Sequence, residues 1–476
     1  MAHTAMTVTM IAAYLAVLTF VALKARAAHQ FEEFSLAGRS LTLPLVFGSL
    51  AATYVGGAFS IGFVGKGFAT GLVFLILGLA FSLQNILVGF FVAPRLRALK
   101  DCHTLGDVIG QKYNRTCQII AGIISVGLCA GFAGVMIKAG GGILADIFGI
   151  PFWCAVILVC AVTTLYTTVG GLRASVITDA FQFTTFAILL PLIFLWLLFQ
   201  TEGGLGHLAK VAIETTSQGW ASFSGLEIVG WLTAFFLGET LIPPNANRAL
   251  GSKSTRVSRN GFLLAGLFSA IWFTVVLSIG ILASIKPEVV TEIMCLPEGA
   301  REDQVLLTLV RTTLPFGFYA LLLVVLLSII MSSLDSLLNA GAVSFTQDIY
   351  RFIASPVSDH RALVQGRWAT VIIAVAAAAG ALLVPSIIKG LLFCYSIWAP
   401  AVLPALLVGL WIPDPKPLAG KLSMLAGSLS GIFFTIVLEK IPPILPALAI
   451  ALTAYLIGHY LSPTQCRADP ERGQKQ

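Results

Sequence analysis

The chain has 476 residues, of which 57% are hydrophobic and only 11% carry a charged side chain. In water such a chain would expose far more apolar surface than a soluble protein does, so the composition excludes a soluble globular domain. The formal net charge of +7 does not indicate a nucleic acid partner, because Lys and Arg lie mainly in short segments between apolar runs. We therefore predict an all-α polytopic membrane protein embedded in the lipid bilayer.

Apolar runs long enough to cross a hydrocarbon core recur along the whole chain, separated by Gly, Pro and charged residues. The first run lacks a preceding basic stretch and a small-residue cleavage pattern, so we predict a retained helix rather than a cleaved signal. The segmentation predicts about thirteen spanning helices, at residues 8–23, 42–63, 70–94, 118–144, 152–169, 178–200, 225–247, 262–285, 314–347, 368–388, 390–411, 420–437 and 443–461.

The basic residues predict the orientation of the chain. Loops on one side of the predicted membrane, together with the C-terminal tail, carry 21 Lys and Arg residues, whereas loops on the opposite side carry 7. Because basic loops are retained in the cytoplasm, we expect a multi-pass protein of the plasma (cytoplasmic) membrane, with the N-terminus outside and the C-terminus in the cytoplasm. In this arrangement residues 248–260 form a basic cytoplasmic loop, and residues 286–311 form the longest external loop.

Two predicted spans contain residues that interrupt a helix. The span at 42–63 carries the consecutive glycines Gly56 and Gly57, and the span at 225–247 carries Pro243-Pro244. Unwound backbone at membrane depth is tolerated where it lines a cavity, and its free carbonyl and amide groups suit the binding of ions and polar solutes. The interrupted spans are the second and the seventh, which is the separation expected for two inverted repeats of five helices.

The ninth predicted span carries polar side chains on one helix face, where Ser332, Asp335, Ser336 and Asn339 recur at intervals of three and four residues. Such groups can hydrogen-bond neighbouring helices, which is the purely structural alternative. A carboxylate among several hydroxyls, with no basic partner on the same helix, instead favours a site for a hard cation built from oxygen ligands.

Three further charged residues lie within predicted spans. Asp179 opens the sixth span, where it can cap the helix N-terminus near Arg173 or bind an ion. Glu239 lies in an interrupted span, and a carboxylate at that depth favours a role in binding solute or a cation. Lys138 lies inside the fourth span, where its ammonium can reach the external surface, pair with Glu239 or meet a carboxylate of the solute.

With these residues in place, the chain resembles the sodium/solute symporter family, whose members carry proline, pantothenate, sialic acid, sugars, iodide and choline. The likeness is closest in motif to the choline- and proline-carrying branches. Four segments in the expected order bear it, namely Leu36-Ala37-Gly38-Arg39-Ser40-Leu41 with Ala52-Thr53-Tyr54-Val55-Gly56-Gly57, Tyr166-Thr167-Thr168-Val169-Gly170-Gly171 with Thr178-Asp179, Pro243 to Arg248, and Met331-Ser332-Ser333-Leu334-Asp335-Ser336 ending at Gln347-Asp348-Ile349-Tyr350.

The resemblance implies a LeuT-type core of five plus five inverted helices. Its first repeat would cover residues 42–203 and its second repeat residues 204–411. An additional N-terminal helix and the first cytoplasmic loop would occupy residues 1–41. Two C-terminal helices would occupy residues 412–462, followed by a cytoplasmic tail at 463–476.

The resemblance also implies Na⁺ as the coupling ion, held at a main site between the second and ninth spans. The implied ligands are the carbonyl oxygens of Ala52, Val55 and Ile329 and the hydroxyl groups of Ser332 and Ser333. Asp179 would lie on the cytoplasmic exit path of the ion or at a second sodium site, near Asp335 and Ser336.

The expected cargo is a small cationic or zwitterionic solute, such as an amino acid or a choline-like compound, whose positive group meets Glu239. Gly56 and Gly57 would leave room and backbone polar groups for it, beside Tyr54 and Lys138. We expect sodium-coupled import by alternating access, with proton-coupled transport or a transporter-derived sensor or channel as the alternatives. Enzymatic activity is not expected, because the six histidines are dispersed, mostly in tails and loops.

Overall fold

The computed structural model describes residues 2–24, 28–384, 386–438 and 442–462. All regular structure in this part of the chain is helical, apart from a single β-bridge between Leu41 and Ser252. The tail predicted at 463–476 lies outside the described residues. The helices are α1 (Ala2–Lys24), α2 (Phe31–Leu36), η1 (Ala37–Arg39), α3 (Leu43–Tyr54), α4 (Gly57–Thr70), α5 (Leu75–Phe91), α6 (Ala93–Ala98), α7 (Leu105–Lys112), α8 (Arg115–Phe148), α9 (Phe152–Phe199), α10 (Gly204–Trp220), α11 (Gly225–Leu237), α12 (Pro243–Gly251), α13 (Thr255–Ser284), α14 (Pro287–Met294), α15 (Glu298–Thr313), α16 (Phe316–Phe345), η2 (Thr346–Tyr350), α17 (Arg351–Ile353), α18 (Asp359–Ala381), α19 (Ile387–Trp411), α20 (Pro417–Val437) and α21 (Ile444–Leu461).

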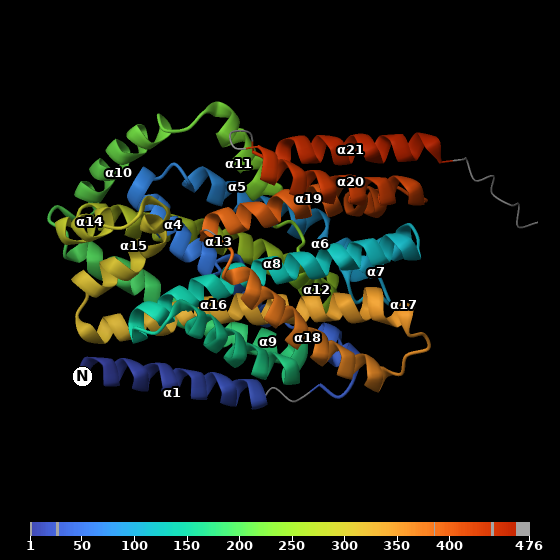
Figure 1. Cartoon of the computed structure of the whole chain (residues 1–476), viewed down its shortest axis with the longest axis horizontal. Helices are drawn as coiled ribbons and strands as arrows, with labels where there is room; N and C mark the ends of the chain where they lie inside the picture. The colour runs from blue at the N-terminus through green and yellow to red at the C-terminus, as the bar shows by residue number, and fades with distance from the viewer. Residues whose placement is uncertain (1, 25–27, 385, 439–441, 463–476) are drawn as a thin grey trace, which may run out of the picture.

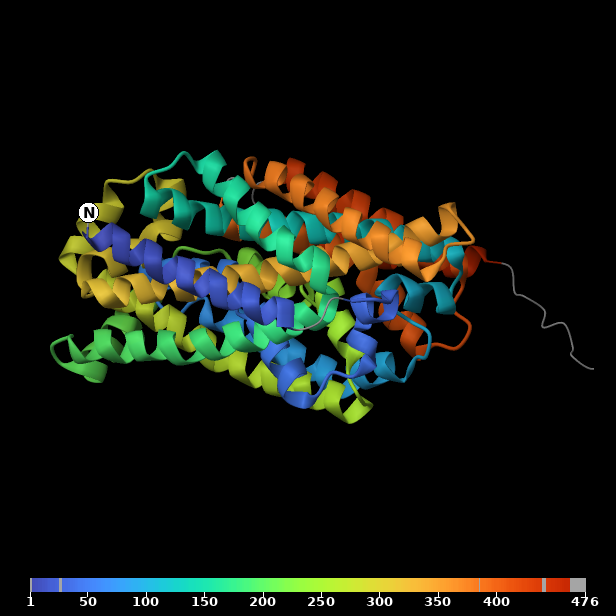
Figure 2. The same ribbon diagram turned by 90° about the horizontal axis from the view of Figure 1, so that it is seen from below.

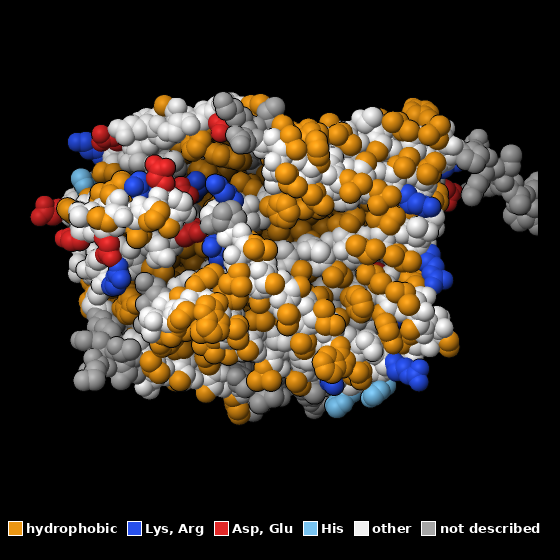
Figure 3. All heavy atoms as spheres, in the orientation of Figure 1, with side chains coloured by type: hydrophobic (Ala, Val, Ile, Leu, Met, Phe, Trp, Pro, Cys, Tyr) orange, Lys and Arg blue, Asp and Glu red, His pale blue; other side chains and the backbone are white. Residues whose placement is uncertain are grey.

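Most of the long helices run along the long axis of the molecule (Figure 1). Among the described residues, nine helices are long and apolar enough to cross a membrane, or up to eleven if each bent pair counts as one span. Most predicted spans correspond to one of these helices or to half of α9, and the first span lies in α1 with its shorter apolar stretch Met6–Leu18. The span predicted at 42–63 covers α3 and the first half of α4, and the span predicted at 225–247 covers α11 and the first half of α12. Hydrophobic side chains cover the middle of the face shown in Figure 3, and charged side chains gather at its two ends.

Helix α9 contains two predicted spans, at 152–169 and 178–200. Its 48 residues would measure about 72 Å if straight, more than twice the hydrocarbon thickness of about 30 Å. The helix is broken at Gly171, whose φ of 59° and ψ of −158° are not helical. Figure 2 shows the chain reversing its direction within α9, so the predicted spans at 152–169 and 178–200 are its two halves.

The two interruptions predicted from the sequence are both present. Helices α3 and α4 are bent by 46°, and their ends are separated by Val55 and Gly56. Helix α11 ends at Leu237 and α12 begins at Pro243, because a proline at the first turn of a helix lacks only an N–H that would have no helical partner. The indole N–H of Trp398 donates to the carbonyl of Thr240 at 3.0 Å, which satisfies one of the backbone groups that the break releases.

Helix α16 lies at the centre of the bundle. In an apolar stretch of 18 residues on this helix, 94% is buried inside the protein. The equivalent stretch of α21 is 28% buried. The polar face predicted in the ninth span therefore contacts other helices rather than lipid.

Two connections are more ordered than the sequence predicts. The external loop expected at residues 286–311 instead contains helices α14 and α15. Helix α10 occupies residues between the sixth and seventh predicted spans, and with α14 and α15 it lies at the end of the molecule where α1 begins (Figure 1). These helices are amphipathic and carry charged residues, which hid them from a search for long apolar runs.

Candidate functional site

The break between α3 and α4 packs directly against the middle of α16. A Cβ atom at Gly56 would lie 2.6 Å from the hydroxyl of Ser333, and one at Gly57 would lie 2.4 Å from Cγ1 of Ile330. Both positions therefore require glycine for this close approach. The structure thus brings together the two segments that the sequence assigns to one sodium site.

The residues expected to hold sodium are buried in this region. The Ser332 hydroxyl is fully buried and has no hydrogen-bond partner in the described part of the chain. The hydroxyl of Ser333 donates to the carbonyl of Ile329 at 3.3 Å, and that of Ser60 donates to the carbonyl of Val55 at 2.5 Å. A buried polar atom without a partner is costly, and a cation is one group that would satisfy an unpartnered oxygen. Ala52, Val55 and Ile329 are buried as well, and carbonyl and hydroxyl oxygens are the kind of ligand that a hard cation prefers.

A second polar cluster lies on the same face of α16, toward α9 and α12. The guanidinium of Arg248 is completely buried and forms an ion pair with Asp179, with Nη2 at 2.8 Å from Oδ2. It also donates to the hydroxyls of Ser49 and Ser336 and to the carbonyl of Pro244 at 2.8 Å. The hydroxyl of Ser49 in turn donates to Asp179 at 2.5 Å.

Asp335 completes this cluster from α16. Its carboxylate accepts hydrogen bonds from Ser175 at 2.9 Å, from Thr178 at 3.3 Å and from Ser336 at 3.2 Å. No ion pair among the described residues involves Asp335. The cluster therefore holds two buried carboxylates and one guanidinium. With both carboxylates ionised, it lacks one positive charge for neutrality.

One alternative for Asp179 and one expectation for Arg248 are wrong. Asp179 does not cap a helix N-terminus, because it lies in the interior of the second half of α9, and Arg173 beside it is exposed. Arg248 was assigned to a cytoplasmic loop on charge alone, yet it lies within α12 and is buried. Arg248 meets Asp179 only because α12 packs against α9 in this way. The sequence carries no local signal for that contact.

Glu239 lies in the break between α11 and α12 and is 4% exposed. The phenolic hydroxyl of Tyr395 on α19 donates to its Oε2 at 3.4 Å, and a Cβ at the preceding Gly238 would lie 2.2 Å from the Tyr395 ring. None of the ion pairs in the described part of the chain involves Glu239. A role of Glu239 in binding solute or a cation stays a prediction.

Aromatic rings pack against Tyr395 and Tyr54. The ring of Tyr395 lies 5.6 Å from that of Phe132 and 5.9 Å from that of Phe235, measured between centroids. Tyr54, which we expected to contact solute, packs edge-on against Phe81 at 5.4 Å and against Phe262, so its ring faces α5 and α13. Its buried hydroxyl has no hydrogen-bond partner among the described residues.

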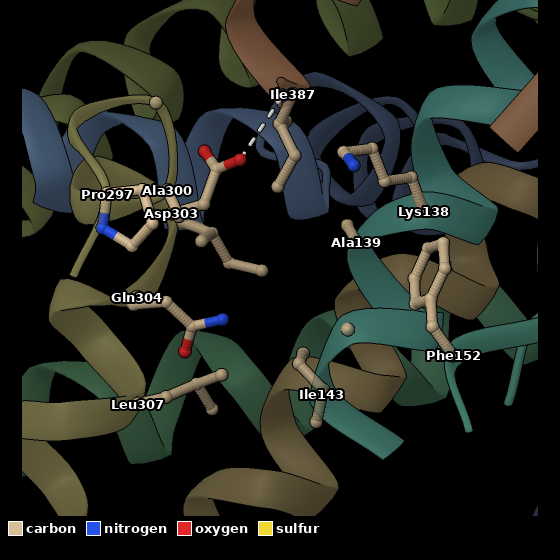
Figure 4. A pocket seen from close by; sticks show the side chains of 13 residues that line it. Lys138, Ala139, Ile143, Phe152, Pro297, Ala300, Asp303, Gln304, Leu307 and Ile387 are labelled. Carbon is tan, nitrogen blue, oxygen red and sulfur yellow. Dashed lines mark hydrogen bonds between the residues drawn. The ribbon is translucent and has the colours of Figure 1, made fainter. Parts of the chain in front are cut away.

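Lys138 lies apart from Glu239 and forms no ion pair with it within the described residues. Its ammonium lies 5.5 Å from the centroid of the Phe152 ring. It lines a cavity of about 400 Å³ between α4, α8, α15 and α19, shown in Figure 4. The alternative in which Lys138 pairs with Glu239 is therefore not present, and Lys138 faces this separate cavity.

Another polar network joins α7, α8 and η2, at the end of the molecule opposite to α15. Gln118 donates to the carboxylates of Asp107 at 2.6 Å and Asp348 at 3.1 Å, and Thr104 donates to Asp348 at 2.6 Å. The neighbouring His103 is bonded through Nδ1 to the hydroxyl of Ser35 at 2.8 Å. Burial lowers the pKa of His103 to about 4, and the charges of Arg351 and Arg39 act in the same direction.

A helical membrane bundle with two broken helices, and with a buried oxygen-rich site where one break meets a central helix, defines a secondary transporter. The comparisons with known proteins agree with this class. The sequence model of the sodium:solute symporter family matches residues 34–415. The chain belongs to that family.

Relatives with assigned activities include a sodium/glucose cotransporter of Vibrio parahaemolyticus, 26% identical over 72% of this chain and 67% of its own length. A sodium/proline symporter of Staphylococcus aureus is 26% identical over 78% of this chain and 74% of its own length. These findings confirm a sodium-coupled transporter and not an enzyme.

The fold is similar to that of a Na⁺-coupled sialic acid symporter solved in a substrate-bound outward-open state. The TM-score is 0.83 at 16% identity, over 95% of this chain and 96% of the other. A nucleobase-cation-symport-1 family transporter superimposes with a TM-score of 0.53 at 14% identity, over 90% and 95% of the two chains. The predicted LeuT-type core is confirmed.

Proposed function

We propose that the chain imports a small cationic or zwitterionic organic solute together with sodium, by alternating access. The observation that carries this proposal is Glu239, a buried carboxylate without a cationic partner in the described part of the chain, located at one helix break beside the ring of Tyr395. A positive solute group would pair with the carboxylate and lie against the ring faces, as cations do in aromatic sites.

The opposite end of a zwitterion has a suitable partner at the other break. Helix α4 begins at Gly57, and the first N–H groups of a helix have no intrahelical acceptor. They carry a partial positive charge that favours a carboxylate, and half-helices at membrane depth commonly present it to anionic groups. Gly56 and Gly57 add no side chain of their own at that end of the helix, which packs against Ser333 and Ile330 of α16.

For sodium, we propose the oxygen atoms of Ala52, Val55, Ile329, Ser332 and Ser333 as ligands. This assignment is supported by the contact between Gly56 and Ser333 and by the unpartnered hydroxyl of Ser332. We further propose Asp179, Asp335 and Ser336 as a second sodium site or the path by which the ion leaves. Because Arg248 already balances one carboxylate, a single additional positive charge would neutralise this cluster.

Coupling follows from sharing of the α3–α4 break. Sodium bound between the break and α16 stabilises the same backbone that presents the N-terminus of α4 to the solute, so each ligand raises the affinity for the other. In the plasma membrane, with the C-terminus in the cytoplasm, inward sodium flow would drive uptake. At about 2.3 kcal/mol per charge per 100 mV, the membrane potential alone supports about fiftyfold accumulation with one sodium.

The test is transport by the purified chain in proteoliposomes, after a thermal-shift screen of amino acids, betaines, choline, sugars and organic acids with and without sodium. We expect a positively charged or zwitterionic hit that is stabilising mainly in sodium, and saturable uptake of that compound down a sodium gradient. Glu239→Gln should abolish its uptake. An acidic or uncharged solute as the sole hit would overturn the role of Glu239.

Two alternatives give different results in the same assay. A proton-coupled transporter would accumulate solute under a pH gradient without sodium, using the buried carboxylates Asp179 or Glu239. A sensor or channel would bind solute, or conduct ions, without accumulating the solute against a gradient.

A further inference from the structure

An apolar cavity lies between α1 and the rest of the helix bundle. Its volume is about 180 Å³, and its walls come from α1, α8, α9 and α16. Helix α1 contacts both α9 and α16 (Figure 2). All the described residues that line the cavity are aliphatic, aromatic or methionine, so no side chain there would hold a water molecule. The cavity is therefore different in kind from the polar sites described above.

The outer part of this cavity is continuous with the lipid-facing surface. Val8 on α1 and Leu158 on α9 both line it, and these side chains are 42% and 44% exposed. Val8 belongs to the apolar stretch Met6–Leu18, and Leu158 belongs to the span predicted at 152–169. Because hydrocarbon surrounds such segments in a bilayer, the molecules that reach the cavity from outside are lipid acyl chains.

The inner end of the cavity is formed by the central helix α16. Leu327, Ile330 and Met331 line it, and each is at most 4% exposed. Ile330 also packs against the α3–α4 break, since its Cγ1 lies 2.4 Å from the position that a Cβ at Gly57 would occupy. Ser332 follows Met331 directly in the chain. A molecule in the cavity would thus contact the segment of α16 that leads to the proposed sodium ligands.

A cavity of this size destabilises the protein if nothing fills it. Side chains around a void lose the attractive contacts that close packing provides, and water does not replace those contacts where it finds no polar partner. Apolar cavities of about 150 Å³ bind molecules of the size of benzene, so a volume of about 180 Å³ accommodates several methylene groups. An acyl chain from the surrounding bilayer has both the chemistry and the access to fill it.

We propose that this cavity is a binding site for one acyl chain of a membrane phospholipid, which enters between α1 and α9 and reaches α16. The headgroup stays at the membrane surface, because the lining offers no polar partner for it. The chain supplies contacts between α1 and α16 that the side chains leave open, and it therefore stabilises α1 against the bundle. This proposal depends neither on the identity of the solute nor on the proposed sodium ligands.

The experiment uses the purified full-length chain in phosphatidylcholine nanodiscs that include a phospholipid with a diazirine near the end of one acyl chain. After illumination, mass spectrometry of proteolytic peptides locates the residues that the probe has labelled. We expect adducts at residues 327–331 of α16. Leu327, Ile330 and Met331 are buried, so a lipid probe reaches them through the cavity. Ile436 on α20 is 76% exposed, and its labelling serves as the internal standard.

Two matched variants on α1 distinguish the cavity from general contact with lipid. Ala12→Phe places a ring in the cavity, whereas Ala13→Phe adds the same ring at an exposed position that does not line it. Labelling of residues 327–331 should fall at least about fivefold in Ala12→Phe, because the ring occupies the space of the chain, and should be unchanged in Ala13→Phe. Size-exclusion profiles and melting temperatures show whether the variants fold. If Ala12→Phe does not, Val162→Phe fills the cavity from α9.

The bound chain also predicts a dependence of stability on lipid. When phosphatidylcholine is added to the delipidated chain in detergent, the melting temperature should rise less in Ala12→Phe than in the natural chain or in Ala13→Phe, since a ligand stabilises the folded state only where its site is free. Equal rises in all three chains would overturn the stabilising role of the acyl chain. The site itself is overturned if residues 327–331 are not labelled, or if Ala12→Phe and Ala13→Phe are labelled equally there.

Discussion

At the scale of single residues, function in this chain rests on polar groups that are buried without a full set of partners. Ser332 has no hydrogen-bond partner in the described part of the chain, and Glu239 has only a long contact with Tyr395. Groups of this kind are costly in a protein interior, and ligands that arrive during transport would satisfy them. Arg248 differs, since it makes contacts with four different residues and stabilises the resting structure.

The sodium site can be tested through its two hydroxyl ligands. In Ser332→Ala and Ser333→Ala, the sodium concentration for half-maximal uptake should rise about tenfold or more, because each variant removes one of five proposed ligands. Ser344→Ala changes a buried serine further along α16 and should leave that concentration unchanged. An unaltered sodium dependence in both ligand variants would show that the ion binds elsewhere.

The Arg248 ion pair predicts a specific pattern of stability. Arg248→Gln leaves Asp179 buried without its cation, which typically costs about 3–5 kcal/mol, so the melting temperature should fall sharply. Removing both charges, in Asp179→Asn with Arg248→Gln, should recover much of that loss. If the double variant is less stable than Arg248→Gln alone, the ion pair is not the source of the effect.

His103 predicts a dependence of stability on pH. Its folded-state pKa of about 4 lies below the ordinary value of about 6.5. Folding therefore favours the neutral ring, and this costs no stability above about pH 6.5, where the ring is neutral in both states. Stability is lost as the pH falls from about 6.5 toward 4. The melting temperature of His103→Gln should therefore decrease less between pH 7.5 and pH 5 than that of the natural chain. An equal decrease would show that His103 is not the titrating group.

At the scale of elements, broken and reversed helices create the site. The α3–α4 break supplies free carbonyl and amide groups beside α16, and the α11–α12 break places Glu239 near α19. The reversal inside α9 brings Asp179 to α16, because a straight continuation would carry it out of the membrane. Such breaks are stable only because neighbouring side chains, such as Trp398 at Thr240, satisfy the released groups.

The reversal in α9 depends on Gly171. Its φ of 59° disfavours any side chain, and a Cβ there would lie 2.7 Å from the backbone Cα of Phe34. Gly171→Ala should therefore reduce the folded yield and lower the melting temperature by several degrees. Gly127→Ala on α8, where a Cβ meets no atom within 4 Å, should be neutral or slightly stabilising. Equal behaviour of the two variants would contradict a requirement for glycine at 171.

At the scale of the whole molecule, the polar sites follow one axis. Helices α14 and α15 lie at one end of the molecule and α7 and α17 at the opposite end, with α12 between them (Figure 1). Residues of α15 line the Lys138 cavity, and His103 precedes α7. The proposed transport route would follow this order, with charged groups toward both ends and partly satisfied polar groups between them.

The proposed orientation makes the α14–α15 end external, which Cys295 can test. This residue lies between α14 and α15 and is exposed, whereas the other described cysteines are buried or partly buried. A membrane-impermeant maleimide should label Cys295 on intact cells, and Cys295→Ser should lose that label. Labelling of Cys295 only after the cells are opened would reverse the orientation.

The sequence alone determined that this is a membrane protein, and it determined the approximate positions of its spans, the two interrupted helices and the polar face of α16. Those features follow from local composition and helical spacing, which require no knowledge of which helices touch. Only the tertiary structure decided that Arg248 pairs with Asp179, that Lys138 faces a cavity with Asp303, and that α9 reverses at Gly171. These contacts join residues far apart in the chain, and their energies depend on packing between helices, for which a single sequence carries no periodic signal.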